Sequence, residues 1–196
     1  LRQRPDRDDL SVTFIDDAEE RVSSFAGLPV QDWSTFKGVS ADRREVVIAI
    51  AAADTRRRLA ERCSQDDISM LAVVAANAYV ADEAKIAEGA VIQPFVTVTS
   101  NAIIGRCFHA NIYSYVAHDC SIGDFVTFAP GVMCNGNVSI GDGAYIGTGA
   151  ILRQGTPTKP LLIGKGAIIG MGAVVTKDVP PGVTVVGNPA RPMVKS

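Results

Sequence analysis

The sequence predicts a parallel β-helix preceded by a small α/β domain, and two observations carry this prediction. From Val80 onward every sixth residue is apolar through thirteen positions, in a chain that is 47% hydrophobic. These residues are Val80, Ile86, Ile92, Val98, Ile104, Ala110, Val116, Ile122, Phe128, Cys134, Ile140, Ile146 and Leu152. Before them stand only two of the 18 glycines, Gly27 and Gly38, and short apolar runs of strand type. A period of six sustained over this length indicates hexapeptide repeats that stack as coils.

Many repeats also carry a small residue two positions before the aliphatic one and a turn pair after it. The turn pairs include Glu88-Gly89, Ser100-Asn101, Gly136-Asn137 and Asp142-Gly143. Gly and Asn tolerate positive φ and therefore suit the corners of a coil. One face is too short to bury a core alone, so the coils must stack before a core exists.

The period breaks at Arg153–Pro160, where two prolines and a glycine predict a protruding loop, and it resumes at Ile163. Pro180-Pro181-Gly182 and Gly187-Asn188-Pro189-Ala190 predict a cap over the last coil. Such a cap is expected because an end coil would otherwise expose its core. The predicted β-helix domain spans residues 78–196.

Residues 1–77 are predicted to form the α/β domain, because strand and helix patterns alternate there. The predicted strands are Leu10–Ile15, Glu45–Ala51 and Leu71–Val74, and Thr55–Cys63 is a predicted helix with Asp54 as its N-cap. Leu1–Asp9 is interpreted as a helix end followed by a turn, and Gly27–Val30 and Trp33–Phe36 as loop or short strand. Arg56–Arg58 is interpreted as part of a solvated helix face.

Composition argues against several classes of partner. A net charge of −2 and a pI near 5.7 give no electrostatic case for nucleic acid or a membrane surface. The longest apolar stretch, Ile68–Ala81, is too short to span a bilayer, and no signal-peptide pattern is present. None of the four cysteines forms a CxxC pair, and Cys120 and Cys134 occupy inward positions. These cysteines are therefore interpreted as small core residues, and a protein with unpaired cysteines fits the reducing cytoplasm.

The candidate chemistry lies at His118, which follows Val116 by two residues and therefore stands at an outward-facing corner. Asp119 comes next at the same corner. A carboxylate beside an imidazole fixes its tautomer and increases its basicity, as a general base near neutral pH requires. The alternative is an idle, solvated surface histidine.

A metal site is not expected. His109 is the only other histidine and is predicted to face outward from a flat strand. Zinc sites of the carbonic-anhydrase type need three histidines, which this chain does not have.

In the first domain, Asp16 and Asp17 follow the strand that ends at Ile15. Ligands of parallel α/β sheets bind beyond the carboxyl ends of strands, so these carboxylates could accept hydrogen bonds from a ribose or a base. An Asp turn or a helix cap is an equally good interpretation of their position.

The segment Asn111-Ile-Tyr-Ser-Tyr-Val-Ala-His-Asp-Cys-Ser-Ile-Gly-Asp124 resembles the active-site coil of one acyltransferase family. This is the bacterial hexapeptide-repeat sugar acetyltransferase group, which includes sialic acid O-acetyltransferases and UDP-4-amino-sugar N-acetyltransferases. The ending Val185-Val-Gly-Asn-Pro-Ala190 is similar to that of many hexapeptide acyltransferases. Phe14-Ile15-Asp16-Asp17 and Ile48-Ala49-Ile50 resemble the family's Rossmann-like nucleotide-sugar domain.

The resemblance implies a left-handed β-helix, a homotrimer and acetyl-CoA bound in a groove between subunits. It implies His118 as general base, Asp119 as its supporting acid and Asn111 as a polar residue near the reacting group. The implied acetyl-CoA contacts are Thr127, Thr148 and Met171, and the implied acceptor contacts are Asp16, Asp17 and Ala51.

The implied reaction is acetyl transfer to the amino group of a nucleotide-linked amino sugar by direct attack. O-acetylation of a sugar or sialic acid and a non-enzymatic trimeric scaffold are the alternatives. The family places a Gly-rich turn with a histidine after its first strand, and this chain begins beyond that point, so we expect a preceding N-terminal segment. Ala51 stands where the family often has Gly or polar residues.

Overall fold

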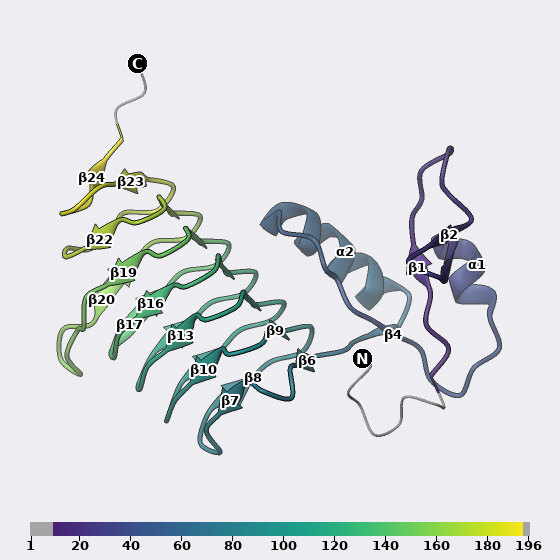
Figure 1. Cartoon of the computed structure of the whole chain (residues 1–196), viewed down its shortest axis with the longest axis horizontal. Coiled ribbons are helices and arrows are strands. Elements are labelled where there is room, and N and C mark those ends of the chain that lie inside the picture. The colour runs from purple at the N-terminus through teal and green to yellow at the C-terminus, as the bar shows by residue number, and fades with distance from the viewer. Residues whose placement is uncertain (1–9, 194–196) are drawn as a thin grey trace. The chain divides into compact units, whose positions relative to one another are not determined.

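The computed structural model describes residues 10–193 (Figure 1). The chain divides into two compact units between Arg44 and Glu45 rather than at the predicted boundary after residue 77. Residues 45–77 belong with the β-helix because a buried arginine on their helix, Arg56, hydrogen-bonds to it. The segment Leu1–Asp9, predicted as a helix end and turn, lies outside the described residues.

The first unit contains a small three-stranded sheet and one short helix. Its elements are β1 (Phe14–Ile15), β2 (Ser24–Phe25), β3 (Leu28–Gln31) and α1 (Trp33–Gly38). β3 is central; it pairs in parallel with β1 and antiparallel with β2. The prediction of loop or strand at Trp33–Phe36 is wrong, because the Asp32 side chain caps a helix there by accepting from the Thr35 N–H.

The second unit opens with a βαβ segment made of β4 (Glu45–Val46), α2 (Ala53–Gln65) and β5 (Ser69–Met70). β4 and β5 pair in parallel and form a sheet of their own, separate from the β1–β3–β2 sheet. The single α/β sheet expected for residues 1–77 is therefore not present among the described residues. The N-cap of α2 is Ala52 rather than the predicted Asp54, which lies within the first turn.

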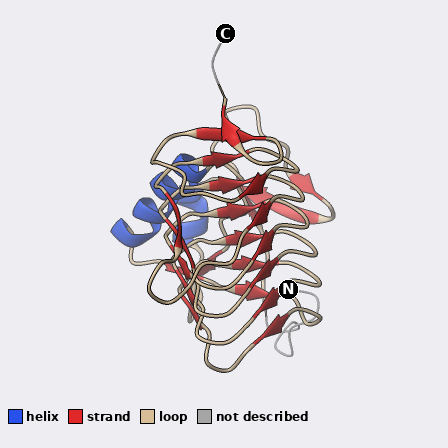
Figure 2. Cartoon of the chain, turned by 90° about the vertical axis from the view of Figure 1, so that its left-hand side faces the viewer, coloured by secondary structure: helices blue, strands red, loops and turns tan. Residues whose placement is uncertain are grey.

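The rest of the second unit is a column of coils in which three sheets run along the axis, and their strands pair in parallel except for the last strand, β24 (Figure 2). Sheet I contains β7 (Tyr79–Val80), β10 (Thr97–Val98), β13 (Tyr115–Val116), β16 (Met133–Cys134), β19 (Ile151–Leu152) and β22 (Val174–Val175). Sheet II contains β8 (Lys85–Ile86), β11 (Ile103–Ile104), β14 (Ser121–Ile122), β17 (Val138–Ile140) and β20 (Leu161–Ile163). Sheet III contains β6 (Val73–Val74), β9 (Val91–Ile92), β12 (His109–Ala110), β15 (Thr127–Phe128), β18 (Tyr145–Ile146), β21 (Ile168–Ile169), β23 (Thr184–Val186) and β24 (Arg191–Pro192).

The predicted aliphatic ladder fills the centre of the column. Every ladder residue from Ile92 to Leu152 is buried, whereas Val80 and Ile86 in the first coil are half-buried. Phe108 and Phe128 pack edge to face, with ring centroids 5.1 Å apart. The prediction that Cys120 and Cys134 are core residues is confirmed.

From Gly89 onward, most corners of the column are built on residues with positive φ. Between sheets I and II these are Asn101, Asp119 and Asn137. The other two corners use Phe95, Tyr113, Cys107 and Phe125, and glycines such as Gly131, Gly143 and Gly149. We call the corner between sheets I and II the I–II corner and the corner between sheets III and I the III–I corner.

The interruption and the cap occur where the sequence predicts them. Residues 153–160 leave the column as a loop closed by a bridge between Thr156 and Lys159. The chain then re-enters sheet II as β20, and the hairpin of β23 and β24 closes the described part of the column.

Candidate active site

His118 and Asp119 form a hydrogen-bonded pair on the I–II corner. His118 Nδ1 lies 2.7 Å from Asp119 Oδ2, and the two side chains are 48% and 45% exposed. The bond from His118 holds the pKa of the Asp119 carboxyl below its usual value. An ionised Asp119 can accept a hydrogen bond from Nδ1–H, which leaves the lone pair of Nε2 able to accept a proton, as a general base requires.

The pair is held by the coils on either side. Asn101, on the preceding coil, places its amide nitrogen 3.1 Å from Asp119 Oδ1. The Asp119 N–H donates to the Ser100 carbonyl at 3.1 Å, and the Asn137 N–H donates to the His118 carbonyl at 3.0 Å. Three successive coils therefore contribute to this corner.

Gly136, on the following coil, lies directly against the His118 ring. A Cβ on Gly136 would meet His118 Cε1 and Nε2 at 2.5 Å and Cδ2 at 3.0 Å. Gly136 does not have positive φ, so the ring rather than the backbone is what excludes a side chain here. The Gly136 N–H has no hydrogen-bond acceptor among residues 10–193.

A second polar group lies on sheet I next to this corner. Tyr115 donates its hydroxyl proton to Asn135 Oδ1 at 2.8 Å, and the Asn135 amide donates to the Leu152 carbonyl at 2.7 Å. Burial raises the pKa of Tyr115, which keeps the phenol protonated near neutral pH. Tyr115 and Asn135 were not among the residues predicted from the sequence.

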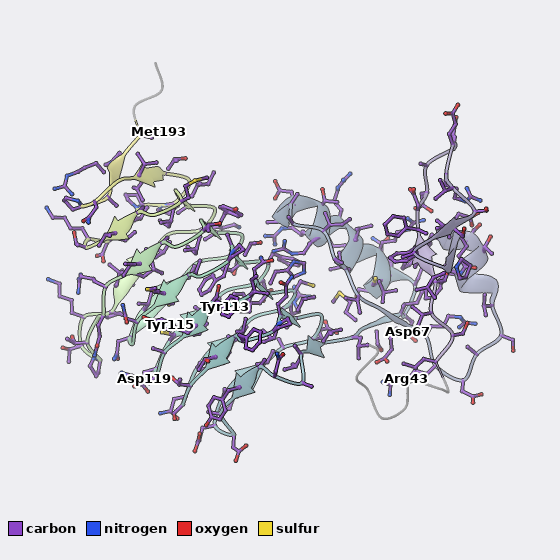
Figure 3. The ribbon with its side chains drawn as sticks, in the orientation of Figure 1. Arg43, Asp67, Tyr113, Tyr115, Asp119 and Met193 are labelled. Atoms are coloured by element: carbon purple, nitrogen blue, oxygen red, sulfur yellow. The ribbon has the colours of Figure 1, made fainter. Side chains whose placement is uncertain are left out.

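Asn111, Thr148 and Met171 stand on the III–I corner, at the opposite edge of sheet I from His118. Figure 3 shows this order through Tyr113 on the III–I corner, Tyr115 on sheet I and Asp119 on the I–II corner. Thr148 and Met171 are exposed and occupy adjacent coils, and Met171 is 81% exposed. Asn111 donates to the Phe128 carbonyl at 2.7 Å. One copy of the chain therefore does not bring these residues to His118.

Thr127 occupies a different environment from the other predicted acetyl-CoA contacts. Its side chain is buried on sheet III, where its hydroxyl accepts from Arg56 Nη2 at 2.8 Å and donates to the Ala51 carbonyl at 3.4 Å. Arg56 also donates to the carbonyls of Ile50, Ala51 and Phe125 at 3.0, 2.7 and 2.6 Å. Arg56 is wholly buried, so interpreting it as part of a solvated face was wrong.

His109 is buried beside this arginine instead of facing solvent as predicted. Its buried Nε2 has no hydrogen-bond partner among the described residues. Burial, and then the nearby Arg56 charge, lowers the pKa of His109 to about 4. His109 is therefore neutral near pH 7 and takes a structural position beneath the segment that leads into α2.

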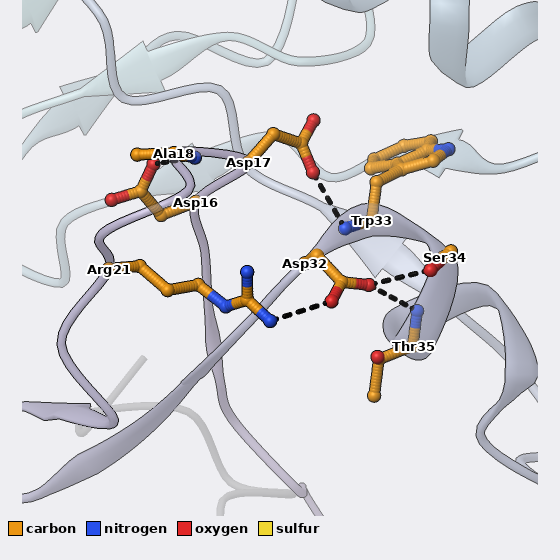
Figure 4. Close-up of polar contacts among 8 residues, drawn as sticks. All are labelled: Asp16, Asp17, Ala18, Arg21, Asp32, Trp33, Ser34 and Thr35. Atoms are coloured by element: carbon orange, nitrogen blue, oxygen red, sulfur yellow. Dashed lines mark hydrogen bonds and ion pairs between the residues drawn. The ribbon is translucent and has the colours of Figure 1, made fainter.

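Asp16 and Asp17 make local hydrogen bonds in the first unit (Figure 4). Asp16 Oδ1 accepts from the Ala18 N–H at 3.0 Å, and Asp17 Oδ1 accepts from the Trp33 N–H at 2.9 Å at the start of α1. Both residues are exposed. Asp32 accepts from Arg21, Ser34 and Thr35, and the bond from the Thr35 backbone is the main reason that the pKa of Asp32 lies far below its usual value.

In the part of the chain that the structure describes, no three His, Cys, Asp or Glu side chains gather as a set that could hold a metal ion. Within the same residues, every helix is too short or too polar to cross a membrane.

Known proteins share both the sequence and the fold of this chain. A protein described as GDP-perosamine N-acetyltransferase from Escherichia coli O157:H7 is 50% identical over 190 residues, which cover 96% of this chain and 85% of that protein. The chain belongs to the bacterial hexapeptide-repeat sugar acetyltransferases. No protein-family model matches it.

Solved structures of sugar acetyltransferases extend this comparison. WeeI from Acinetobacter baumannii AYE is 56% identical with a TM-score of 0.89, over 92% of this chain and 85% of WeeI. The acetyltransferase domain of PglB from Neisseria gonorrhoeae FA1090, in complex with acetyl coenzyme A, is 30% identical with a TM-score of 0.84, over 92% of this chain and 85% of that domain. These relatives are left-handed β-helix acetyltransferases, as expected for this column.

Proposed function

We propose that this sugar acetyltransferase transfers the acetyl group of acetyl-CoA to the amino group of a nucleotide-linked amino sugar. The observation that carries the proposal is the exposed His118–Asp119 pair, whose 2.7 Å hydrogen bond leaves Nε2 able to accept a proton. GDP-perosamine is the first acceptor to test, because a relative that is 50% identical is described as acting on it. The cosubstrate is supported by the PglB domain, which was solved with acetyl coenzyme A.

The reaction is a direct attack of the amine on the thioester carbonyl. His118 Nε2 accepts the proton that the amine loses as it bonds to the carbonyl carbon. Asp119 stabilises the imidazolium that forms, because its carboxylate accepts from Nδ1. Collapse of the tetrahedral intermediate expels the CoA thiolate, which takes up a proton, so no covalent intermediate with the protein is needed.

The oxyanion of that intermediate needs a hydrogen-bond donor within reach of His118. The Gly136 N–H is our candidate, because Gly136 adjoins the His118 ring and its N–H donates to no described residue. Such a donor contributes about 3 kcal/mol to transition-state stabilisation.

The active site is proposed to form between copies of the chain in a homotrimer. His118 stands on the I–II corner, whereas Asn111, Thr148 and Met171 stand on the III–I corner, across sheet I. A neighbouring copy whose III–I corner faces His118 would bring both sets to one groove. Thr127 is left out of the proposed acetyl-CoA contacts, because Arg56 and Ala51 engage its hydroxyl.

Asp16, Asp17 and Ala51 are proposed as contacts for the nucleotide part of the acceptor, as the family resemblance implies, and the Rossmann-like character of this region remains part of that proposal. Asp16 is exposed, with one carboxylate oxygen engaged by Ala18. Asp17 also caps α1 through Trp33, so a variant at Asp17 needs a folding control.

The four cysteines are free thiols, in keeping with a proposed cytoplasmic location.

Thiol release from acetyl-CoA is the direct test. We expect turnover with GDP-perosamine and weaker or no turnover with hydroxy sugars and sialic acid. Replacing His118 with Ala should reduce kcat by about 10²–10⁴-fold without loss of acetyl-CoA binding. Turnover restricted to hydroxy sugars would indicate O-acetylation instead, and a lack of acetyl-CoA binding by calorimetry would indicate a scaffold.

A further inference from the structure

We propose that Asn101 is a positioning residue for the acetyl-transfer reaction, acting on His118 through Asp119. The inference rests on the proposed role of His118 as general base. Asn101 Nδ2 lies 3.1 Å from Asp119 Oδ1, and Asp119 Oδ2 lies 2.7 Å from His118 Nδ1. The three side chains therefore form a continuous chain of hydrogen bonds that ends at the His118 imidazole, whose Nε2 is the proposed base.

The chemistry of the partners fixes the direction of these bonds. An ionised carboxylate can only accept, so the Asn101 group that faces Asp119 must be the amide NH₂. Asp119 is held in the ionised form, because hydrogen bonds first from His118 and then from Asn101 lower its pKa. Asn101 engages Oδ1, so Oδ2 remains as the acceptor for the hydrogen bond from His118 Nδ1.

A turn requirement alone does not explain the asparagine. Asn101 has φ of +60°, and asparagine tolerates that region. Other corners of the column meet the same requirement with Phe95, Cys107 and Tyr113, so the fold does not demand an amide. What distinguishes Asn101 is its side-chain bond to the next coil at the corner that carries His118.

The hydrogen bond from Asn101 restrains an Asp119 carboxylate that is otherwise exposed to solvent. Asp119 is 45% exposed, so an unrestrained carboxylate could rotate about its Cβ–Cγ bond and exchange His118 for water. The amide of Asn101 holds Oδ1 and thereby keeps Oδ2 aligned with Nδ1. Removing it should make the productive ring orientation less populated, without altering any surface that binds substrate.

Two substitutions test this role while respecting the backbone. Asn101→Gly removes the amide and keeps positive φ at little steric cost. Asn101→Asp keeps the shape but replaces the donor with a second carboxylate facing Asp119. Asp67→Gly is the control, because Asp67 is exposed, has φ of +53° and lies at the end of α2, away from the I–II corner.

We expect Asn101→Gly to reduce kcat by about 3- to 30-fold, less than loss of the base itself, with KM for acetyl-CoA and melting temperature unchanged. Asn101→Asp should reduce kcat further and move the acidic limb of the kcat/KM profile to higher pH, because added negative charge favours the imidazolium. Asp67→Gly should match the wild type. In an Asp119→Asn background, Asn101→Gly should cause no further loss.

Wild-type kcat and an unchanged pH profile in both Asn101 variants would overturn the inference. An equal loss from Asn101→Gly in the wild-type and Asp119→Asn backgrounds would also overturn it, since the effect would then bypass Asp119. These results are distinct from failure of the proposed function, which would show as near-normal turnover by His118→Ala.

Discussion

His118 takes its orientation from neighbours in three successive coils. Asp119 holds Nδ1, Asn101 on the coil before holds Asp119, and Gly136 on the coil after lies against the ring. Because a displacement of about 1 Å can reduce turnover about 10²-fold, each of these neighbours affects catalysis through geometry.

Gly136→Ala is therefore expected to be a folded but poorly active variant. The added Cβ would lie 2.5 Å from two ring atoms of His118, so the imidazole must move, whereas the backbone conformation of Gly136 accepts alanine. We expect kcat to fall about 10²-fold with little change in melting temperature. Steady-state kinetics and a thermal melt measure both quantities.

Gly38→Ala is the matched control, since a Cβ there meets nothing within 4 Å and Gly38 does not have positive φ. It should keep full activity. Wild-type turnover in Gly136→Ala would show that the His118 ring can shift without cost, against the geometry described.

The outward position of His118 follows from sequence, because the period of six fixes which residues point inward. Asn101 and Gly136 could have been found by the same arithmetic. Three hexapeptides make one coil, and Asn101 precedes Asp119 by 18 residues. Counting one coil back from Asp119 and one coil forward from His118 gives both residues. What the period cannot supply is side-chain direction, such as the bond between Asn101 and Asp119.

At the scale of elements, one buried arginine joins α2 to the β-helix. Arg56 donates to four backbone carbonyls and to the Thr127 hydroxyl, and no carboxylate is among these partners. Burial lowers the pKa of the guanidinium, but its neutral acceptors still satisfy both terminal nitrogens. Sequence could not reveal this, because Arg56 and Phe125 are 69 residues apart and no repeat relates them.

Arg56→Met should loosen α2 while leaving the column intact. The variant leaves several buried carbonyls without a hydrogen-bond donor, which should lower the free energy of unfolding by at least about 2 kcal/mol. We expect faster amide exchange in α2 and unchanged protection in β12, β15 and β18, measured by hydrogen exchange with mass spectrometry. Arg58→Met, on an exposed position of the same helix, is the control and should exchange like the wild type. Uniform loss of protection would instead mean that the column depends on α2.

His109 predicts a pH dependence of stability with a definite sign. Its pKa is about 4 in the folded protein, against 6.5 for an unperturbed histidine, so only the unfolded state gains a proton between these values. Its contribution to stability is complete above about pH 6.5 and falls towards pH 4, by at most about 1.4 kcal/mol per pH unit.

Urea unfolding at pH 7 and pH 5 tests this, with His109→Gln as the comparison. The wild type should lose more stability than His109→Gln over this interval. Equal losses would place the acid sensitivity in other groups.

At the scale of the whole molecule, the chain separates the proposed catalytic groups by one face of the column. His118 lies directly after β13, the sheet I strand of its coil, and Thr148 and Met171 lie on the corner before sheet I. The fold of the column was predictable because every coil repeats the same local pattern. The division at residue 44 was not, because it depends on the contacts of α2.

Mixed trimers can show whether a site needs two copies. His118→Ala removes the base, and Met171→Glu places a charge at an exposed position of the proposed acetyl-CoA groove. Each variant alone should be inactive, but co-expression should restore about a quarter of the sites, because one interface in four pairs an intact I–II corner with an intact III–I corner.

The double variant mixed with the wild type provides the reference activity, and sedimentation should give a trimer for every sample. Absence of recovery in the mixed trimers would contradict the proposed pairing of the I–II corner of one copy with the III–I corner of its neighbour.

Only three successive coils contribute to the His118 corner, so the other coils of the column are separate from the proposed chemistry. The coils from Ser100 to Asn137, which we call the catalytic cassette, would hold the reacting groups, and the coils above and below would set only the length of the proposed acetyl-CoA groove. An insertion of one whole coil outside the cassette would preserve the phase of every side chain, whereas a single added residue inside it would turn His118 away from its neighbours. Such proteins can therefore change the reach of their binding groove in whole-coil steps while their chemistry stays the same.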